Sequence, residues 1–193
     1  MANHYNPSIK RVIDLLVSIP LILLALPLMI LIWIAIKATS HGPALFCQPR
    51  IGKDGQQFIL LKFRSMSVTE TNTTSFMKSQ NDPRVTTVGA VLRQTSLDEL
   101  PQLFNVFMGD MSLVGPRPLL KIMCNDNDPR TIRRHTVPPG ITGYWQIYAR
   151  HLNTSIELMF PYDLRYIEEA SVTVDLKILL RTIPAVFSGS GAW

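Results

Sequence analysis

The alternation of hydrophobic and polar positions along the chain begins with a long apolar run. Residues 15–36 read LLVSIPLILLALPLMILIWIAI, 22 residues without a charge. A helix of about 20 apolar residues is long enough to cross the hydrocarbon layer of a bilayer. The run exceeds the apolar region of a signal peptide, about 7–15 residues, and no small-x-small cleavage pattern follows it. The pattern therefore predicts a membrane helix near the start of the chain.

Two prolines and the flanking charges bear on the topology of this helix. Pro20 and Pro27 lie inside the run, and an interior proline removes a hydrogen bond and kinks or breaks a helix. Lys10 and Arg11 precede the run, and Lys37 and further basic residues follow it. A spanning helix has its Lys/Arg excess on one side, whereas two basic ends suit a re-entrant hairpin. These residues alone leave both topologies open.

Strand-like and helix-like patterns follow. Residues 44–64 place two strand-like runs around Lys53-Asp54-Gly55, which predicts a β-hairpin. Its second strand would carry Lys62 and Arg64 on one face, because alternate residues of a strand share a face. The Thr-, Ser- and Asn-rich stretch 68–84 is predicted to be loop.

The middle and end of the chain have helical spacing. Short helices are predicted over 88–93 and 97–107, the second capped by Ser96 and with apolar positions three and four apart: Leu97, Leu100, Phe104 and Phe107. Residues 137–150, rich in Pro and Gly, are predicted to be a binding loop with Tyr144, Trp145 and Tyr148. Residues 175–187 are amphipathic, which fits core packing or a membrane surface. The patterns predict a mostly helical α+β fold, with a membrane anchor over 1–40 and one catalytic domain over 41–193.

Charge and cysteine content narrow the function classes. Residues 1–64 carry seven Lys and Arg against two Asp and Glu, while the rest of the chain carries twelve of each. A basic collar beside an apolar anchor suits anionic headgroups or phosphorylated ligands better than nucleic acid. Cys47 and Cys124 stand far apart without metal-binding spacing, which predicts reduced thiols, a cytoplasmic catalytic face and neither a disulfide framework nor a zinc site.

Two adjacent carboxylates, Asp98 and Glu99, stand in the apolar stretch TSLDELPQLFNVFMGDMSLVGPRP. Acidic residues in a first helical turn often complement the helix dipole, but neighbours point about 100° apart and cannot both serve one core face. One can face a substrate while the other holds a cation. An aspartate can also attack phosphorus and form an acyl phosphate.

Such an attack requires neutralised phosphate charge. The candidate cations are Lys62, Arg64, Arg93 and Arg117. Arg117 stands between Pro116 and Pro118, whose fixed φ angles restrict its backbone. A Mg²⁺ ion held by carboxylate and phosphate oxygens would complete the arrangement. Walker A, GxGxxG, HExxH and GxSxG patterns are absent from the sequence, which argues against P-loop hydrolases, zinc proteases and serine esterases.

The motifs together resemble those of the monotopic bacterial phosphoglycosyl transferases, also called bacterial sugar transferases. The likeness covers nearly the whole chain. It consists of KRVID before the apolar run, GPALFCQPRIG, LLKFRSM, TSLDELPQLFNVFMGDMSLVGPRP, PPGITGYWQI and DLKILLRTIPAVFSGSGAW. As a set these motifs are far more specific than the apolar run or any single arginine.

The resemblance implies transfer of a phosphosugar from a UDP-sugar to undecaprenyl phosphate, with release of UMP, as the first membrane step of surface glycan assembly. It implies that Asp98 is the nucleophile, that a covalent aspartyl-phosphosugar forms, and that Glu99 and Asp98 hold Mg²⁺. Further residues match basic or acidic positions of the family that we expect in substrate phosphate binding: Lys62, Arg64, Arg93, Arg117 and Asp163.

The resemblance also implies a re-entrant membrane helix, broken at a Ser-Pro pair, and amphipathic helices at the membrane interface around the site. Here the matching pair reads Leu26-Pro27, so the serine hydroxyl is missing. Ala149 replaces a common glycine. The expected location is the bacterial inner membrane, with the catalytic domain in the cytoplasm. Membrane lipid and downstream glycosyltransferases are the expected partners of this small, catalytic-core member.

Two other functions fit parts of the pattern. A membrane-anchored scaffold that recruits glycan enzymes would use the apolar anchor and the amphipathic C-terminal helix. A sugar-nucleotide hydrolase would keep the same chemistry and use water as the acceptor. The identity of the sugar does not follow from the sequence.

Overall fold

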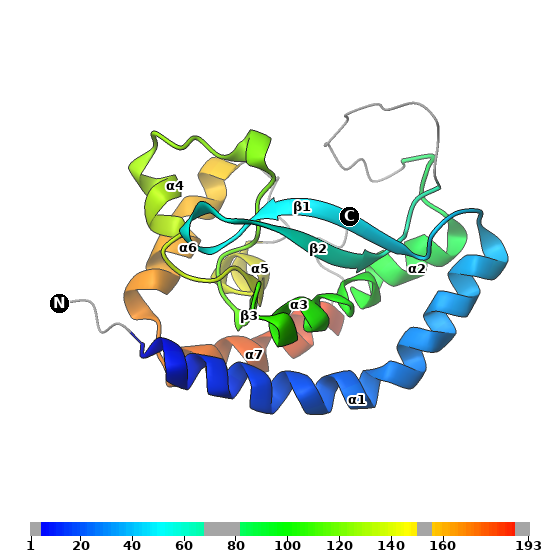
Figure 1. Ribbon diagram of the computed structural model, residues 1–193, viewed down its shortest axis with the longest axis horizontal. Helices are drawn as coiled ribbons and strands as arrows, with labels where there is room; N and C mark the ends of the chain where they lie inside the picture. Colours follow the sequence, from blue (N-terminus) through cyan, green and yellow to red (C-terminus); the bar gives the residue numbers. More distant parts are fainter. Residues whose placement is uncertain (1–4, 68–81, 150–155, 188–193) are drawn as a thin grey trace.

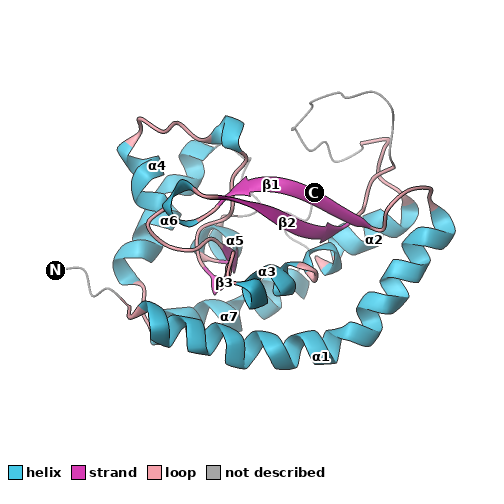
Figure 2. Cartoon of the chain, viewed as in Figure 1, coloured by secondary structure: helices cyan, strands magenta, loops and turns pink. Residues whose placement is uncertain are grey.

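Helices make up most of the fold, and the described strands form two small sheets (Figure 2). The computed structural model describes residues 5–67, 82–149 and 156–187. In chain order the elements are α1 (Pro7–Thr39), β1 (Leu45–Ile51), η1 (Lys53–Gly55), β2 (Gln57–Phe63), α2 (Thr87–Gln94), η2 (Leu97–Glu99), α3 (Gln102–Met108), β3 (Ser112–Val114), η3 (Lys121–Met123), α4 (Pro129–Arg134), β4 (Gly140–Thr142), α5 (Tyr144–Tyr148), α6 (Ile156–Glu169) and α7 (Val172–Phe187). The mostly helical α+β class is confirmed, and most of the predicted loop 68–84 lies outside the described residues.

The long apolar helix α1 is not interrupted at Pro27, where a break was predicted. It is one continuous helix through Pro20 and Pro27, and it curves around the rest of the domain (Figure 1). A proline removes one backbone hydrogen bond, but the neighbouring turns can continue the helix across it. At the start of α1, the Asn6 side chain accepts a hydrogen bond from the amide of Ser8 at 2.9 Å, which caps the first turn.

One side of α1 packs on the domain and the other presents apolar side chains outward. Met29, Ile32 and Ile36 are buried at helical spacing. Leu23 and Leu24 are 67% and 80% exposed. By length and composition α1 is able to cross a membrane. A large exposed apolar surface of this kind marks contact with lipid or a partner.

Buried polar groups fasten the start of α1 to distant elements. Asp14 accepts hydrogen bonds from Ser112 Oγ and from the amide of Leu113, both at 3.0 Å. Lys10 Nζ lies 2.7 Å from Asp175 Oδ2 of α7. Buried charges are retained in proteins when they are paired or hydrogen-bonded. Helix α1 is therefore fixed to β3 and α7 through its polar N-terminal turns.

The predicted hairpin is confirmed. Strands β1 and β2 pair antiparallel over their full length. Asp54 and Gly55 adopt positive φ angles, 54° and 74°, the left-handed conformation that a tight hairpin turn requires. The register places Arg50 and Lys62 on the same face of the hairpin.

The stretch 137–150, predicted to be a loop, contains a strand and a helix up to residue 148. Strand β4 pairs parallel with β3, and α5 follows it. Gly140 allows this close approach, because a Cβ there would lie 2.0 Å from the amide nitrogen of Gly115. Gly140 therefore allows the two strands to pair, which the Pro- and Gly-rich composition of the stretch did not indicate.

The predicted amphipathic helix over 175–187 is confirmed as α7, which begins three residues earlier. Ile178 is buried at 1% exposure. On the other side, Leu176, Leu180 and Ile183 are all more than half exposed. The helix therefore packs on the core with one face and presents an apolar stripe with the other.

Candidate active site

The adjacent carboxylates lie in the 3₁₀ turn η2, not in the first turn of a long helix. The predicted helix is divided at Pro101, which has no N–H to donate to the carbonyl of Leu97. The amide of Leu100 bonds to that carbonyl instead, at 3.3 Å, as in a 3₁₀ turn. Asp98 and Glu99 are consequently half-buried on a tight turn ahead of α3.

The residue before this turn is strained. Ser96, predicted as a helix cap, has a φ angle of 57° and makes no capping hydrogen bond with its side chain. A left-handed conformation is unfavourable for a residue with a side chain and often occurs at functional sites. Phe104 packs against the core as predicted, whereas Phe107 is 48% exposed. The apolar run therefore supports the turn through fewer residues than its spacing suggested.

Two of the predicted cations meet Glu99. Lys62 Nζ of β2 lies 2.6 Å from Glu99 Oε1, and Arg117 Nη2 lies 3.5 Å from the same oxygen. The three side chains are 15%, 27% and 17% exposed for Lys62, Arg117 and Glu99, respectively. Screening by water is therefore reduced, and this cluster can bind a multiply charged phosphate at its two cations.

A further arginine stands close to this cluster, and the sequence analysis did not select it. Burial and the charge of Arg117 lower the pKa of Arg50, the charge of Glu99 raises it, and together they bring it to about 10. These charge effects mark Arg50 as a neighbour of Arg117 and Glu99. The available signal was the strand alternation, which puts Arg50 on the Lys62 face of the hairpin once the Asp-Gly turn sets the register.

Arg64 does not join the cluster in this structure. Its guanidinium donates to the carbonyls of Ser40 and His41, at 2.9 and 2.6 Å, and to Ser40 Oγ at 2.8 Å. These acceptors follow the end of α1, where the last helical carbonyls lack intrahelical partners. Arg64 is buried and ties β2 to the end of α1.

Arg93 and Asp163 also lie apart from the Glu99 contacts. Arg93 lies in the last turn of α2, and its charge acts on Asp82. Asp163 Oδ2 accepts a hydrogen bond from Arg134 Nε at 2.7 Å in the interior. Burial raises the pKa of Asp163, and the charges of Arg134 and Arg117 oppose that rise. Arg134 thus links Asp163 to Arg117.

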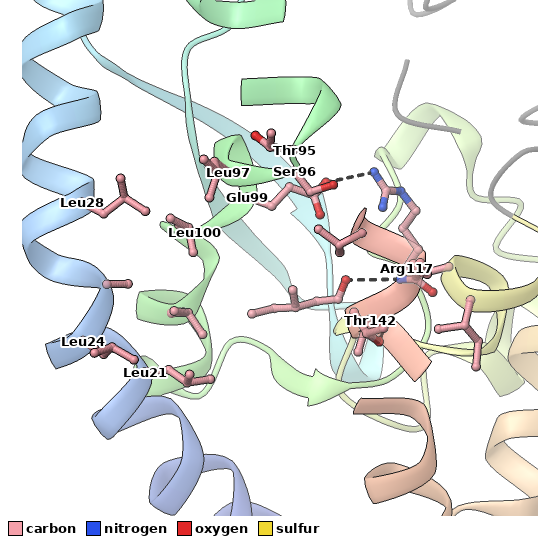
Figure 3. Close-up of a pocket in the computed structure, with 18 residues that line it drawn as sticks. Leu21, Leu24, Leu28, Thr95, Ser96, Leu97, Glu99, Leu100, Arg117 and Thr142 are labelled. Carbon is pink, nitrogen blue, oxygen red and sulfur yellow. Dashed lines mark hydrogen bonds and ion pairs between the residues drawn. The ribbon is translucent and has the colours of Figure 1, made fainter. Parts of the chain in front are cut away.

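An apolar cavity of about 460 Å³ ends at Glu99 and Arg117. Figure 3 shows Leu21, Leu24 and Leu28 of α1 on one side of this cavity and Arg117 on the other. Its remaining lining comes from four parts of the chain: residues 95–103, β4, α5 and the end of α7. The described lining includes Glu99 but not Asp98. The cavity lining therefore combines an apolar surface of α1 with the charged side chains of Glu99 and Arg117.

The carboxylates fit a Mg²⁺ ion that is bound together with a phosphate. Among the described residues no group of three or more His, Cys, Asp or Glu side chains forms a metal cluster. Mg²⁺ commonly takes one or two protein carboxylates and completes its shell with substrate phosphates and water. Asp98 and Glu99 on one turn provide two such carboxylates.

Comparison with known proteins identifies the family. The chain matches the sequence model of the bacterial sugar transferases over residues 5–189. It belongs to the bacterial sugar transferase family. The UDP-glucose:undecaprenyl-phosphate glucose-1-phosphate transferase of Klebsiella pneumoniae is 42% identical over 199 residues, which cover 99% of this chain and 43% of that protein. The resemblance seen in the motifs is confirmed.

Other bacterial sugar transferases differ in name and length. The undecaprenyl-phosphate galactose phosphotransferase of Salmonella typhimurium is 35% identical, over 100% of this chain and 43% of its own. The exopolysaccharide production protein ExoY of Rhizobium meliloti is 40% identical, over 95% of this chain and 88% of its own. The chain therefore spans less than half of the glucose and galactose transferases and most of ExoY.

Proposed function

We propose that this protein transfers a phosphosugar from a UDP-sugar to undecaprenyl phosphate and releases UMP, the first membrane step of surface glycan assembly. One observation carries the proposal. Glu99 and Arg117 line an apolar cavity that also contacts α1, Lys62 pairs with the same Glu99 oxygen as Arg117, and Asp98 is the neighbour of Glu99 on one turn. This site suits a reaction between a charged donor and a lipid phosphate. The names of the Klebsiella and Salmonella relatives support undecaprenyl phosphate as the acceptor, and that of the Klebsiella relative supports a UDP-sugar as the donor.

In the first step, a carboxylate oxygen of Asp98 attacks the β-phosphorus of the donor. The bond between that phosphorus and the bridging oxygen breaks, and UMP leaves with the bonding electron pair. Lys62 and Arg117 stabilise the negative charge on the phosphoryl oxygens and on the departing UMP. The product is an acyl phosphate between Asp98 and the sugar phosphate.

In the second step, an oxygen of the lipid phosphate attacks the same phosphorus. The bond to Asp98 breaks, the carboxylate is restored, and the phosphosugar is transferred to the lipid. The cavity along Leu21, Leu24 and Leu28 offers an apolar environment for the isoprenoid chain next to its phosphate. Excluding water from this cavity favours transfer over hydrolysis of the intermediate.

Asp98 and Glu99 would hold the Mg²⁺ ion together with donor phosphate oxygens. The ion would offset phosphate charge as the β-phosphorus is attacked. Glu99 Oε1 already faces Lys62 and Arg117, so these two cations keep the carboxylate oriented. Removal of Mg²⁺ with EDTA is expected to abolish UMP release, and a rate unchanged by EDTA would exclude the metal.

We also infer a re-entrant topology, with both ends of α1 on the cytoplasmic side of the inner membrane. The curvature of α1 and the exposed apolar stripe of α7 support an in-plane arrangement at one leaflet. Cysteine would be introduced at Asn3 or, as a cytoplasmic reference, at Lys53, after replacing Cys47 and Cys124 with serine. Labelling of Asn3→Cys by an impermeant reagent added from the periplasm would refute this topology.

The activity can be tested with purified protein in detergent or nanodiscs. Undecaprenyl phosphate, Mg²⁺ and a panel of UDP-sugars are supplied, and UMP is quantified. We expect UMP release with one or more sugars, its loss in Asp98→Asn, and its retention in the exposed control Asp126→Asn. Undiminished release by Asp98→Asn would contradict the mechanism.

The same assay separates the alternatives. Without lipid, the transferase releases at most one UMP per protein, and intact-mass spectrometry detects the added phosphosugar in the wild type but not in Asp98→Asn. Many turnovers without lipid would indicate a sugar-nucleotide hydrolase. No turnover with any donor would leave the membrane-anchored scaffold as the remaining function.

A further inference from the structure

The Pro-Arg-Pro segment, residues 116–118, is fastened mainly through its carbonyl groups. Its two prolines have no N–H and cannot donate to a neighbouring strand. The amide of Gly140 donates to the carbonyl of Pro116 at 2.8 Å. Just beyond the segment, the amide of Ile51 donates to the carbonyl of Leu119 at 2.9 Å. Backbone bonds thus hold both ends of the segment that carries Arg117.

Two arginines supply side-chain donors to the carbonyls between these ends. Arg50 Nη1 donates to the carbonyl of Pro118 at 3.2 Å. Arg134 Nη2 donates to the carbonyl of Arg117. A guanidinium has several donors in one plane and can bind a carbonyl and a carboxylate together. Arg134 does so, because its Nε also donates to Asp163 Oδ2 at 2.7 Å.

Arg134 and Asp163 form this contact in the interior. Their side chains are 1% and 2% exposed, and they come from two different helices, α4 and α6. The desolvation free energy of a buried ion pair is about as large as the attraction between its charges. Such a pair therefore stabilises the fold less than apolar packing would. What the pair provides is a guanidinium with a fixed orientation under the carbonyl of Arg117.

We propose that Arg134, oriented by Asp163, is a positioning residue that sets where the Arg117 guanidinium meets the donor phosphates. The proposal rests on the phosphate-binding role of Arg117 given above. Arg134 contacts the backbone of Arg117, so it acts through the segment and does not touch substrate. The Arg117 guanidinium is 3.5 Å from Glu99, and a displacement of about 1 Å at such a site can cost about 100-fold in rate.

A double-mutant cycle tests the proposal. Arg134→Lys keeps the charge but loses the planar pair of donors, and Asp163→Asn keeps the shape but loses the carboxylate. Each is combined with Arg117→Ala. The readouts are kcat/KM for the UDP-sugar, the Kd of UMP by calorimetry, and the midpoint of thermal unfolding. The Kd remains measurable where turnover is lost.

The control lies between the same two helices. Arg130 of α4 pairs with Glu157 of α6 at 2.8 Å and is 46% exposed. Arg130→Gln therefore removes an ion pair between α4 and α6 without touching the Arg117 carbonyl. It is expected to leave kcat/KM and the Kd of UMP within about twofold of wild type, the usual scatter between independent sites.

With Arg117 present, Arg134→Lys and Asp163→Asn should lower kcat/KM about 10- to 100-fold and weaken UMP binding. In the Arg117→Ala background, neither substitution should change the Kd by more than about twofold. Equal weakening in both backgrounds would show a structural role and overturn the proposal, as would unchanged kinetics with Arg117 present. A wild-type protein without UMP release would instead contradict the proposed function itself.

Discussion

Replacement of Asp14 offers the most direct test of how helix α1 is attached to the domain. The carboxylate is 5% exposed and accepts two hydrogen bonds at 3.0 Å, from Ser112 Oγ and from the amide of Leu113. In Asp14→Ala both donors lose their acceptor in the interior. A buried donor left without an acceptor costs about 1–3 kcal/mol, so the two together cost about 2–6 kcal/mol.

Asp14→Asn should be milder, because the amide retains one acceptor oxygen and loses the charge, which leaves a cost of about 1–3 kcal/mol. For a chain of this length, 1 kcal/mol shifts the unfolding midpoint by about 2–4 °C. The alanine variant should therefore unfold on the order of 10 °C below wild type, and the asparagine variant between the two.

The measurement is thermal unfolding in one detergent, followed by intrinsic fluorescence or calorimetry, with lipid and salt held constant. Asp126→Ala serves as the control because its side chain is 67% exposed and pairs with a surface lysine; it should stay within about 2 °C of wild type. If Asp14→Ala unfolds together with this control, the carboxylate does not carry the attachment and the reasoning is wrong.

Four further outcomes are expected. Lys62→Met should lower UMP release about 100-fold, measured at saturating donor, because a buried phosphate loses a preorganised cation. Ala25→Phe, which fills the cavity, should block transfer to lipid but keep the single UMP release without lipid, whereas Leu23→Phe on the exposed face should keep both. EDTA should stop UMP release, and excess Mg²⁺ should restore it. Burial lowers the pKa of His135 in the folded protein. The unfolded state therefore binds more protons, and the free energy of unfolding falls as the pH drops below about 6.5. His135→Gln should reduce the decrease in unfolding midpoint that the protein shows between pH 7.5 and pH 5.5.

The hairpin, the apolar helix and α7 could be predicted because local patterns specify them. The Asp54-Gly55 turn sets a register by its own backbone preference. The uncharged run 15–36 and the period of 175–187 each persist long enough to fix an element type. None of these three predictions depends on a residue that is distant in the sequence.

One error arose where a distant partner decides the conformation, and two arose at prolines. Gly140 looks like a loop residue until Gly115 is placed opposite it in a parallel pair. Pro101 divides a run whose apolar spacing favours one helix. Pro27 is a helix breaker by local rules, yet the turns around it continue α1.

The structure brings together three of the candidate residues, Lys62, Glu99 and Arg117, and the interactions that support them were not predicted. Lys62 and Arg117 meet Glu99 as charge complementarity suggests. Arg64 is instead bound by the carbonyls after α1, and Asp163 by Arg134. Every residue has a backbone carbonyl. The sequence therefore does not distinguish an arginine that binds carbonyls from one that binds phosphate.

The attachment of α1 has a consequence for the order in which the chain is made. Lys10 pairs with Asp175, 165 positions later, and Asp14 binds groups 98 and 99 positions later. During synthesis from the N-terminus, the apolar helix leaves the ribosome long before either partner exists. Its polar first turns must therefore wait for β3 (Ser112–Val114) before Asp14 can bind, and for α7, much later in the chain, before Lys10 can pair.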